Sequence, residues 1–375
     1  MATQTANLDS LTGGKIPSTM RAVVYRGVND MRVETVPVPA IGPGELLIKV
    51  ATCGICGTDL KKIHTGSHSA PRIFGHEMSG TIVKVGEGAR FAVGERVVVH
   101  HHVPCGDCYN CRKKTPTQCA LYKKVGVTAG FEPSGGGFAE YIRVMDWIAA
   151  SRGVVRIPDG VPFEQAAFAE PVNTVLKGVK LLNLAPDDTV LVIGQGPIGL
   201  MHAALARRTG ARVLTSDLYP ERHAIAAKFG LSDPIYAGSE NVVQRVSAET
   251  DGRGADAVIL AVGGNALIQT AMDAVRPGGK VLLFAQTQHG QATFDPGAVC
   301  MDEKTLLGSY SSSFEILNEV TDLVFAGYKN GFDLTQLISH RFQMEQAVEA
   351  IEIASHPKGD SMKIMIESVP GAGAE

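Results

Sequence analysis

Four of the seven cysteines in this chain lie close together in the sequence. Their spacing is C-x2-C-x2-C, then seven residues and a last cysteine, at Cys105, Cys108, Cys111 and Cys119. Thiols at such short intervals, in a chain without an export signal, are expected to share a metal rather than to form disulfides. Four thiolates hold zinc in a closed tetrahedron with no position for a substrate. The cluster therefore predicts a structural zinc site, and the chemistry must lie elsewhere.

A second set of zinc-ligand residue types lies upstream of these cysteines. Residues 56–59 read Cys-Gly-Thr-Asp, and residues 75–77 read Gly-His-Glu. A catalytic zinc uses three protein ligands and keeps one position open. Glu170 is a further candidate, because a carboxylate in an apolar run is costly to bury unless it is paired or bound to metal. A single histidine or glutamate at such a place is more often a satisfied structural residue, so only their convergence favours a metal site.

A glycine-rich turn in the second half of the chain has the order of a dinucleotide-binding motif. An apolar run at 190–193 passes into Gly194, Gln195, Gly196, Pro197, Ile198 and Gly199, and a helical stretch follows. The first glycine makes the turn, the second lets the backbone approach a pyrophosphate, and the third allows close packing. A glycine turn alone is common, but the predicted strand before it and helix after it favour a Rossmann fold.

The coenzyme preference rests on the end of the next predicted strand. Asp217 lies close to the offset of ~20 residues at which an acid accepts hydrogen bonds from the adenosine ribose. The same carboxylate would repel a 2′-phosphate, so we predict NAD over NADP. Arg222 follows shortly after Asp217. It is a candidate to stack on adenine or to bind that phosphate, or else it is a solvated helix residue.

Two kinds of predicted elements position these groups. Residues 20–156 consist of short β-rich runs separated by glycine and proline turns, which predicts a β barrel-like domain. After Pro158, short apolar strands alternate with helical stretches, which predicts a parallel doubly wound sheet. The fold class is therefore α/β plus β, and 375 residues suit two domains. Beyond about residue 310 the alternation fades, and the simplest arrangement returns this segment to the first domain.

Composition excludes several classes of partner. The net charge of −3 and a hydrophobic fraction of 45% are typical of a globular enzyme and favour neither nucleic acid nor an anionic membrane. The basic clusters at 112–114 and 123–124 would suit a nucleic-acid-binding zinc module only within an extended basic face. They are more simply solvated residues. The polar first residues lack the features of a signal peptide, and together with free thiols they predict a cytoplasmic protein.

On these motifs the chain resembles the zinc-containing medium-chain dehydrogenase/reductase family, in the branch of sorbitol and threonine dehydrogenases. Residues 75–80, which read Gly-His-Glu-x-x-Gly, match the zinc signature of the family, and the four-cysteine loop and residues 194–199 match its structural zinc lobe and coenzyme loop. The resemblance begins near Met20. It implies a GroES-like catalytic domain of residues 1–171, completed by 312–375, and a Rossmann NAD-binding domain of residues 172–311.

The resemblance also implies roles for individual residues. Cys56 and His76 would be ligands of the catalytic zinc, and Glu170 occupies the position where liver-type alcohol dehydrogenases have a second cysteine. Glu77 is either a direct ligand or a group that exchanges with water, so both acids stay candidates. In the same way, Asp59 would orient the ligand histidine, Thr58 would receive the alcohol proton, and Thr174 would pack against the nicotinamide.

One departure from the family pattern concerns the proton relay. The usual relay histidine lies two residues after the aspartate, and here that residue is Lys61. The relay could run through His64, through the coenzyme ribose to water, or not through the protein at all, and His64 is more simply a surface residue. Among the other candidates, Cys300 has no partner cysteine, and we expect it to be buried as an apolar residue. The three histidines at 100–102 are not expected to converge on a metal, because neighbouring strand residues alternate faces.

The expected activity is reversible oxidation of a secondary alcohol or polyol to a ketone by hydride transfer to NAD, with two zinc ions per chain and a homotetrameric assembly. A threonine-type 3-hydroxy amino acid is the alternative substrate. Such a substrate requires groups that hold an ammonium and a carboxylate, and the polar Glu170 site slightly favours the polyol. A catalytically inactive scaffold is disfavoured by the intact Cys56, His76 and glycine-rich motif.

Overall fold

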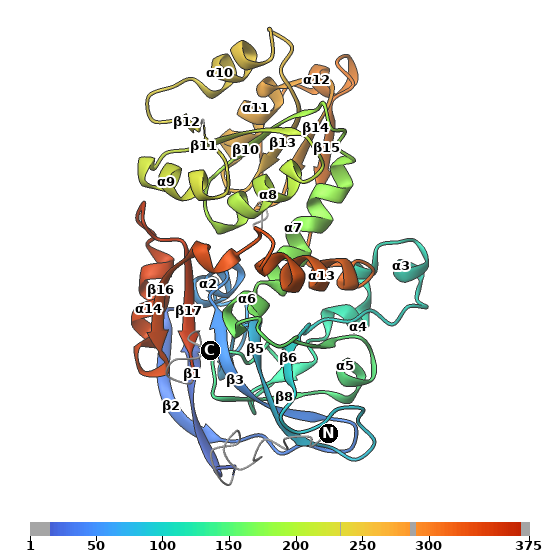
Figure 1. The fold of residues 1–375 in the computed structure, drawn as a ribbon, viewed down its shortest axis with the longest axis vertical. Helices are drawn as coiled ribbons and strands as arrows, with labels where there is room; N and C mark the ends of the chain where they lie inside the picture. The colour runs from blue at the N-terminus through green and yellow to red at the C-terminus, as the bar shows by residue number, and fades with distance from the viewer. Residues whose placement is uncertain (1–15, 233, 286–289, 369–375) are drawn as a thin grey trace, which may run out of the picture. The chain divides into compact units, whose positions relative to one another are not determined.

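The computed structural model describes residues 16–232, 234–285 and 290–368 (Figure 1). Most of the amino-terminal extension noted above, residues 1–15, lies outside the described residues. The chain divides into two compact units. The first contains Met1–Glu170, Leu317–Pro357 and Lys363–Glu375, and the second contains Pro171–Ile316 and Lys358–Met362.

The first unit is built mainly from antiparallel strands, as the β-rich runs predict. A three-stranded sheet has the order β2 (Asp30–Pro37), β1 (Thr19–Gly27), β4 (Arg72–Ile73). A larger sheet has the order β16 (Ile338–Gln343), β17 (Lys363–Glu367), β3 (Leu46–Gly54), β5 (Glu77–Val85), β6 (Arg96–Val99), β9 (Val154–Arg156). In addition, β8 (Tyr141–Val144) pairs with β3 and with β7 (Val127–Thr128). Because β17 pairs with β3, residues 365–367 lie beside the strand that leads to Cys56.

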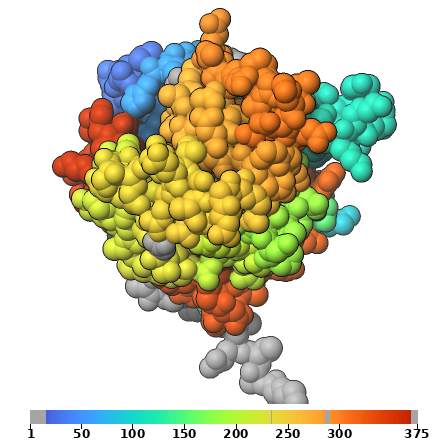
Figure 2. Space-filling view, turned by 90° about the horizontal axis from the view of Figure 1, so that it is seen from above, coloured from blue at the N-terminus to red at the C-terminus, as the bar shows by residue number. Residues whose placement is uncertain are grey.

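Short helices connect these strands. They are α2 (Gly57–Thr65), α3 (Tyr109–Arg112), α4 (Ala120–Lys123), α5 (Asp146–Ala150), α6 (Phe163–Ala167), α13 (Leu317–Tyr328) and α14 (Ala347–Ser355). Three 3-10 turns, η1 (Pro116–Gln118), η2 (Leu334–Leu337) and η3 (Met344–Gln346), complete the unit. Helix α2 ends at Gly66, whose φ of 64° is in the left-handed region that glycine adopts without strain. The lobe that carries α3 and α4 protrudes from the rest of this unit (Figures 1 and 2).

The second unit contains the predicted parallel sheet. Its order is β12 (Ile235–Tyr236), β11 (Arg212–Asp217), β10 (Thr189–Ile193), β13 (Ala255–Leu260), β14 (Val275–Leu283), β15 (Thr305–Gly308), and the five pairings are all parallel. In chain order this is 3-2-1-4-5-6, the order of a Rossmann fold. Its helices are α8 (Pro197–Arg207), α9 (Pro220–Lys228), α10 (Val242–Glu249), α11 (Asn265–Ala274) and α12 (Pro296–Cys300), while α7 (Ala169–Leu182) begins at the junction of the units.

Buried aliphatic side chains form the core of this sheet, including Leu191, Val258 and Val281. Each of these side chains has no exposed surface, which agrees with strands covered on both faces. The predicted doubly wound sheet is therefore confirmed. None of the helices in the described ranges is both long enough and apolar enough to cross a membrane.

Candidate active site and coenzyme loop

The first metal-ligand group forms where β3 and β5 run side by side. Gly54, at the end of β3, is opposite Glu77, at the start of β5, so Cys56 just after β3 lies beside His76. One ligand atom from each of Cys56, His76 and Glu77 lies within 4.8 Å of the others. The turn before His76 requires glycine, because Gly75 has a φ of 92° and a Cβ there would lie 2.6 Å from the ring of Phe138.

The hydroxyl of Thr58 and the carboxylate of Asp59 complete this group. Thr58 Oγ1 lies 3.3 Å from Cys56 Sγ and 3.4 Å from His76 Nε2. Asp59 is fully buried, and its Oδ1 lies 3.1 Å from His76 Nδ1. Burial alone would raise the pKa of Asp59, but His76, with Lys62 and a backbone N–H, outweighs burial and lowers the pKa to about 2. A carboxylate on Nδ1 leaves Nε2 as the nitrogen that can bind a metal.

A buried lysine that sequence reasoning missed contacts Glu77. Lys363 Nζ on β17 donates to Glu77 Oε2 at 2.6 Å and to the carbonyl of Ile55 at 3.2 Å. Burial would lower the pKa of Lys363, but Glu77 and neighbouring groups raise it. Glu77 Oε1 is buried and has no hydrogen-bond partner among the residues that the structure describes. An orphaned carboxylate oxygen beside a thiol and an imidazole is what a site for zinc would show in the absence of the ion.

Glu170 lies at the start of α7 and does not belong to the tight group of three. Burial raises its pKa to about 7, while His76 lowers the pKa and Glu77 raises it. These effects show that the carboxylate is electrostatically coupled to the group. Glu77 is thus the carboxylate within the group of three, and both acids remain candidate ligands.

The ring nitrogens of His64, the candidate relay residue, contact groups other than the thiol and imidazole. His64 is exposed, as expected, and its two ring nitrogens lie 2.6 Å from Asn29 Oδ1 and 3.0 Å from Ser355 Oγ. Lys61 lies within α2, where its carbonyl accepts a hydrogen bond from Thr65. None of these hydrogen bonds involves Thr58, from which a proton relay would start.

One expectation from the sequence is wrong. Cys300 is exposed at the end of α12 rather than buried. For the histidine triplet, the argument from strand alternation does not apply, because β6 ends at Val99. The groups of possible metal ligands among the described residues do not include these three histidines. The ring of His101 lies 5.0 Å from that of His76, and the ring of His102 lies 4.1 Å from that of His101.

The four-cysteine lobe has the geometry of a closed metal site. Three sulfur pairs lie 3.5 to 3.9 Å apart, and the ligand atoms of Cys105, Cys108, Cys111 and Cys119 all lie within 4.8 Å of one another. Zn–S bonds of ~2.3 Å in a tetrahedron place the sulfurs about 3.8 Å apart, so the lobe fits zinc. None of the four cysteines is in a disulfide.

The coenzyme loop has the backbone geometry that its glycines predict. Gly194 has a φ of 101°, and a Cβ on Gly199 would lie 1.7 Å from the carbonyl of Gly194. Gly196 precedes α8, with Pro197 at its first position and Ile198 next. No heavy atom of the described residues lies within 4 Å of a Cβ built on Gly196, which leaves space for a phosphate to approach the N-terminus of α8.

Asp217 is fixed by the loop and by Arg222. Its Oδ2 accepts a hydrogen bond from Gln195 N at 2.6 Å and lies 3.1 Å from Arg222 Nη1, while Oδ1 accepts one from Tyr219 N at 2.9 Å. Arg222 is 13% exposed and is therefore not a solvated helix residue. Thr174, the predicted nicotinamide contact, donates to the carbonyl of Pro171 at 2.8 Å within α7.

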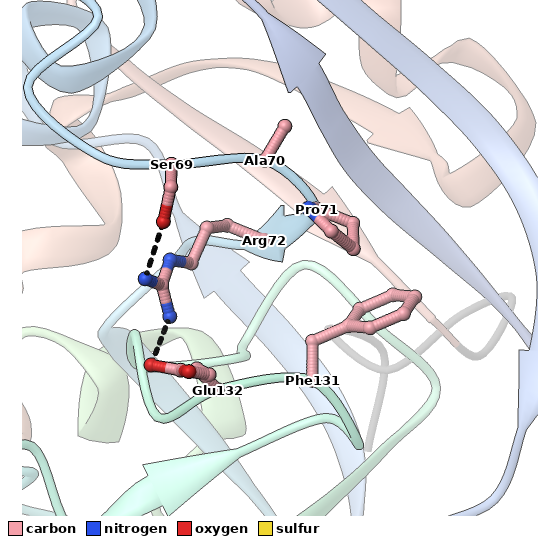
Figure 3. A pocket seen from close by; sticks show the side chains of 6 residues that line it. All are labelled: Ser69, Ala70, Pro71, Arg72, Phe131 and Glu132. Carbon is pink, nitrogen blue, oxygen red and sulfur yellow. Dashed lines mark hydrogen bonds and ion pairs between the residues drawn. The ribbon is translucent and has the colours of Figure 1, made fainter.

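A separate open pocket in the first unit does not overlap these groups. Its volume is about 290 Å³, and it is lined by Ser69, Ala70, Pro71, Arg72, Phe131 and Glu132. The guanidinium of Arg72 is bonded within it, to Glu132 at 2.8 Å and to Ser69 at 3.0 Å (Figure 3). Its cation is therefore already paired.

Comparison with known proteins finds a matching family for each of the two parts of the chain. The family described as "Alcohol dehydrogenase GroES-like domain" matches residues 42–159, and "Zinc-binding dehydrogenase" matches residues 197–326. The chain is 29% identical to sorbitol dehydrogenase of Bacillus subtilis over 94% of this chain and 98% of that protein. It is 33% identical to L-threonine 3-dehydrogenase of Sinorhizobium medicae, over 93% and 98% of the two chains.

A solved structure shows the same fold. It is that of a protein from Sinorhizobium meliloti described as a zinc-binding dehydrogenase bound to NADP, with a TM-score of 0.83 and 29% identity over 94% of this chain and all of that one. The predicted GroES-like and Rossmann fold class is thereby confirmed. Two family models match the two parts of the chain, and a relative at 33% identity is covered over nearly its whole length. The chain therefore belongs to the zinc-containing medium-chain dehydrogenase/reductase family of the alcohol dehydrogenase superfamily.

Proposed function

We propose that this protein reversibly oxidises a secondary alcohol or polyol to the ketone by hydride transfer to NAD. The observation that carries the proposal is the convergence of Cys56, His76 and Glu77 beside the hydroxyl of Thr58. The sorbitol dehydrogenase relative supports a polyol substrate. The threonine dehydrogenase relative supports the alternative, a 3-hydroxy amino acid.

Each residue of the group has a distinct task in this proposal. Cys56, His76 and one carboxylate, Glu77 or Glu170, would hold a zinc ion, which when bound polarises the alcohol oxygen as a Lewis acid. Asp59 holds His76 through Nδ1 and so keeps Nε2 directed at the metal. Thr58, whose hydroxyl lies among these ligands, would accept the proton released by the alcohol.

The second unit would bind the coenzyme, and we propose NAD over NADP. Asp217 would accept hydrogen bonds from the adenosine ribose, and its charge would repel a 2′-phosphate. Arg222 is paired with that same carboxylate, so its charge is partly compensated. The test is the ratio of kcat/KM for NAD to that for NADP. A ratio that favours NADP would overturn the preference.

The resemblance to the family supports a proposal for the domain boundaries, the compartment and the assembly. We propose a catalytic part of residues 1–171 with 312–375, a coenzyme-binding part of residues 172–311, and a cytoplasmic homotetramer. The unpaired cysteines support a reducing compartment. Sedimentation equilibrium would measure the mass of the assembly, and a dimer or monomer mass would overturn the tetramer.

Substitution of the ligands tests the catalytic assignment. Cys56→Ala and His76→Ala should each abolish NADH formation while leaving NAD binding, measured by calorimetry, within about twofold of the unsubstituted protein. The substrate panel should include sorbitol, other polyols, 2-butanol, 2,3-butanediol and L-threonine. Turnover of L-threonine alone would favour the amino acid alternative, and an active Cys56→Ala/His76→Ala double variant would refute the site.

A further inference from the structure

His101 is a buried imidazole beside the active site for which the proposed chemistry has no role. The residue is only 8% exposed. Its Nδ1 is buried and has no hydrogen-bond partner among the described residues. Its ring lies 5.0 Å from the ring of His76, with the two planes inclined by 38°. A buried polar atom without a partner is costly, so a ligand group that hydrogen-bonds this nitrogen would gain free energy from the contact.

The backbone around His101 is fixed on both sides. The N–H of His100 donates to the carbonyl of Gly153 at 2.7 Å, and the carbonyl of His101 accepts from Gly126 N at 3.0 Å. These bonds fix the backbone from which the side chain of His101 projects. His101 is a built part of the wall beside His76 rather than a mobile surface group.

A stack of rings holds the imidazole of His101 from behind. The ring of His102 lies 4.1 Å from that of His101 and is stacked on Tyr122 at 4.9 Å and 21°. A hydrogen bond between His102 and the backbone of Tyr122 anchors the stack. Tyr122 lies in α4, directly after the last cysteine of the metal lobe. The four-cysteine lobe thus helps to position a group at the active site.

The position of His101 makes it unsuitable as a metal ligand. The group whose ligand atoms lie within 4.8 Å of one another contains Cys56, His76 and Glu77 but not His101. The ring of His101 lies 5.0 Å from that of His76, so a substrate bound at the Cys56 and His76 group would have its neighbouring atoms within reach of His101. An imidazole can donate from one nitrogen and accept at the other, which matches a hydroxyl.

We propose that His101 is a specificity residue that hydrogen-bonds a hydroxyl adjacent to the carbinol being oxidised, and so selects vicinal diols and polyols over simple alcohols. This inference rests on the proposed dehydrogenase function. A substrate with the second hydroxyl satisfies the orphaned imidazole nitrogen. A substrate without it leaves that nitrogen unpaired in a buried site, which lowers its kcat/KM.

The test compares 2,3-butanediol with 2-butanol, which differ by one hydroxyl. In the unsubstituted holoenzyme, kcat/KM should be higher for the diol. His101→Phe keeps a flat ring but removes both nitrogens, so it should reduce the diol preference by roughly three- to tenfold, the effect of one hydrogen bond, with little change for 2-butanol. His101→Gln, which keeps a donor and an acceptor, should retain part of the preference.

His100→Phe is the matched control, because it changes a buried neighbour for which no ring contact with His76 exists among the described residues. Its diol preference should equal that of the unsubstituted protein. The thermal midpoint and the zinc content of each variant identify misfolding or metal loss. An unchanged diol preference in a folded, zinc-loaded His101→Phe variant overturns the inference, as does an equal loss for both substrates. Loss of one zinc would make His101 a ligand and would also overturn it.

The outcome also separates this inference from the proposed function. If the unsubstituted protein oxidises neither alcohol, the proposed function fails for this substrate class. Binding then decides the role of His101. A rise in the thermal midpoint with 2,3-butanediol but not with 2-butanol, lost in His101→Phe and kept in His100→Phe, would support a diol-binding residue. If 2,3-butanediol raised the thermal midpoint equally in the unsubstituted protein and in His101→Phe, the inference would be overturned.

Discussion

At the scale of single residues, His202 links the stability of the second unit to pH. Its imidazole lies in α8 with no exposed surface, and neither ring nitrogen has a hydrogen-bond partner among the described residues. Burial lowers its pKa from 6.5 to about 3. The unfolded chain therefore binds one more proton than the folded chain between these values, and stability should decrease as the pH falls from 6.5 toward 3.

Replacing His202 with leucine should remove this dependence. We expect His202→Leu to raise the thermal midpoint at pH 5 by several degrees and to have a smaller effect at pH 8, where the histidine is neutral in both states. Differential scanning calorimetry across this range would measure it. His356→Leu is the control, because that side chain is 74% exposed, and it should change neither midpoint. A gain independent of pH would contradict the linkage.

The buried pair of Lys363 and Glu77 is the second prediction at this scale. In the zinc-free protein, removing one partner leaves an uncompensated charge, so Lys363→Met should there lower the free energy of unfolding by about 3–5 kcal/mol. Glu77→Gln in the same chain removes the second charge and should recover part of the loss. Urea unfolding of both single variants and the double variant would give the coupling energy. Additive effects of the two substitutions would show that the contact contributes little.

At the scale of elements, two glycines in the turn between β10 and α8 have different roles: Gly199 allows close packing and Gly196 leaves space for the coenzyme. Gly199→Ala would place a Cβ 1.7 Å from the carbonyl of Gly194 and should destabilise the unit, whereas Gly196→Ala meets no heavy atom within 4 Å. We therefore expect Gly196→Ala to keep its thermal midpoint but to weaken NAD binding, because its methyl group occupies the space for the pyrophosphate. Calorimetric binding and thermal unfolding of both variants would distinguish them. Normal NAD affinity in folded Gly196→Ala would contradict the assigned position of the phosphates.

The same elements show how far the sequence predicts this fold and site. The strand at 190–193 and the helix after it are found as β10 and α8, because strands buried on both faces form continuous apolar runs. Helices α3 and α4 have only four residues each, too few for helical periodicity to appear. Lys363 contacts Glu77 across 286 residues. No local pattern encodes such a pair, and the only signal is a lysine at the start of the buried strand β17.

At the scale of the whole molecule, the two metal groups should differ in what they support. The lobe group offers four thiols, which would fill a tetrahedral zinc, whereas the Cys56 group offers a thiol, an imidazole and a carboxylate, three ligands that would leave one position for a substrate. We expect two zinc ions per chain by plasma emission spectrometry, and one each in Cys56→Ser and Cys111→Ser. Cys56→Ser should lose turnover but retain its thermal midpoint within a few degrees. Cys111→Ser should lower the midpoint strongly, because structural zinc contributes directly to folding.

The ring stack predicts an additional consequence of losing the lobe metal. Since Tyr122 follows Cys119 and supports His102 and His101, a disordered lobe should release the imidazole beside His76. Cys111→Ser should therefore lose its preference for 2,3-butanediol over 2-butanol, even at a temperature where it remains folded and still holds the zinc at Cys56. The control is Cys300→Ser, an exposed cysteine outside both metal groups, which should retain both zinc ions and the diol preference. An unchanged preference in the lobe variant would show that the lobe stabilises the unit without positioning His101.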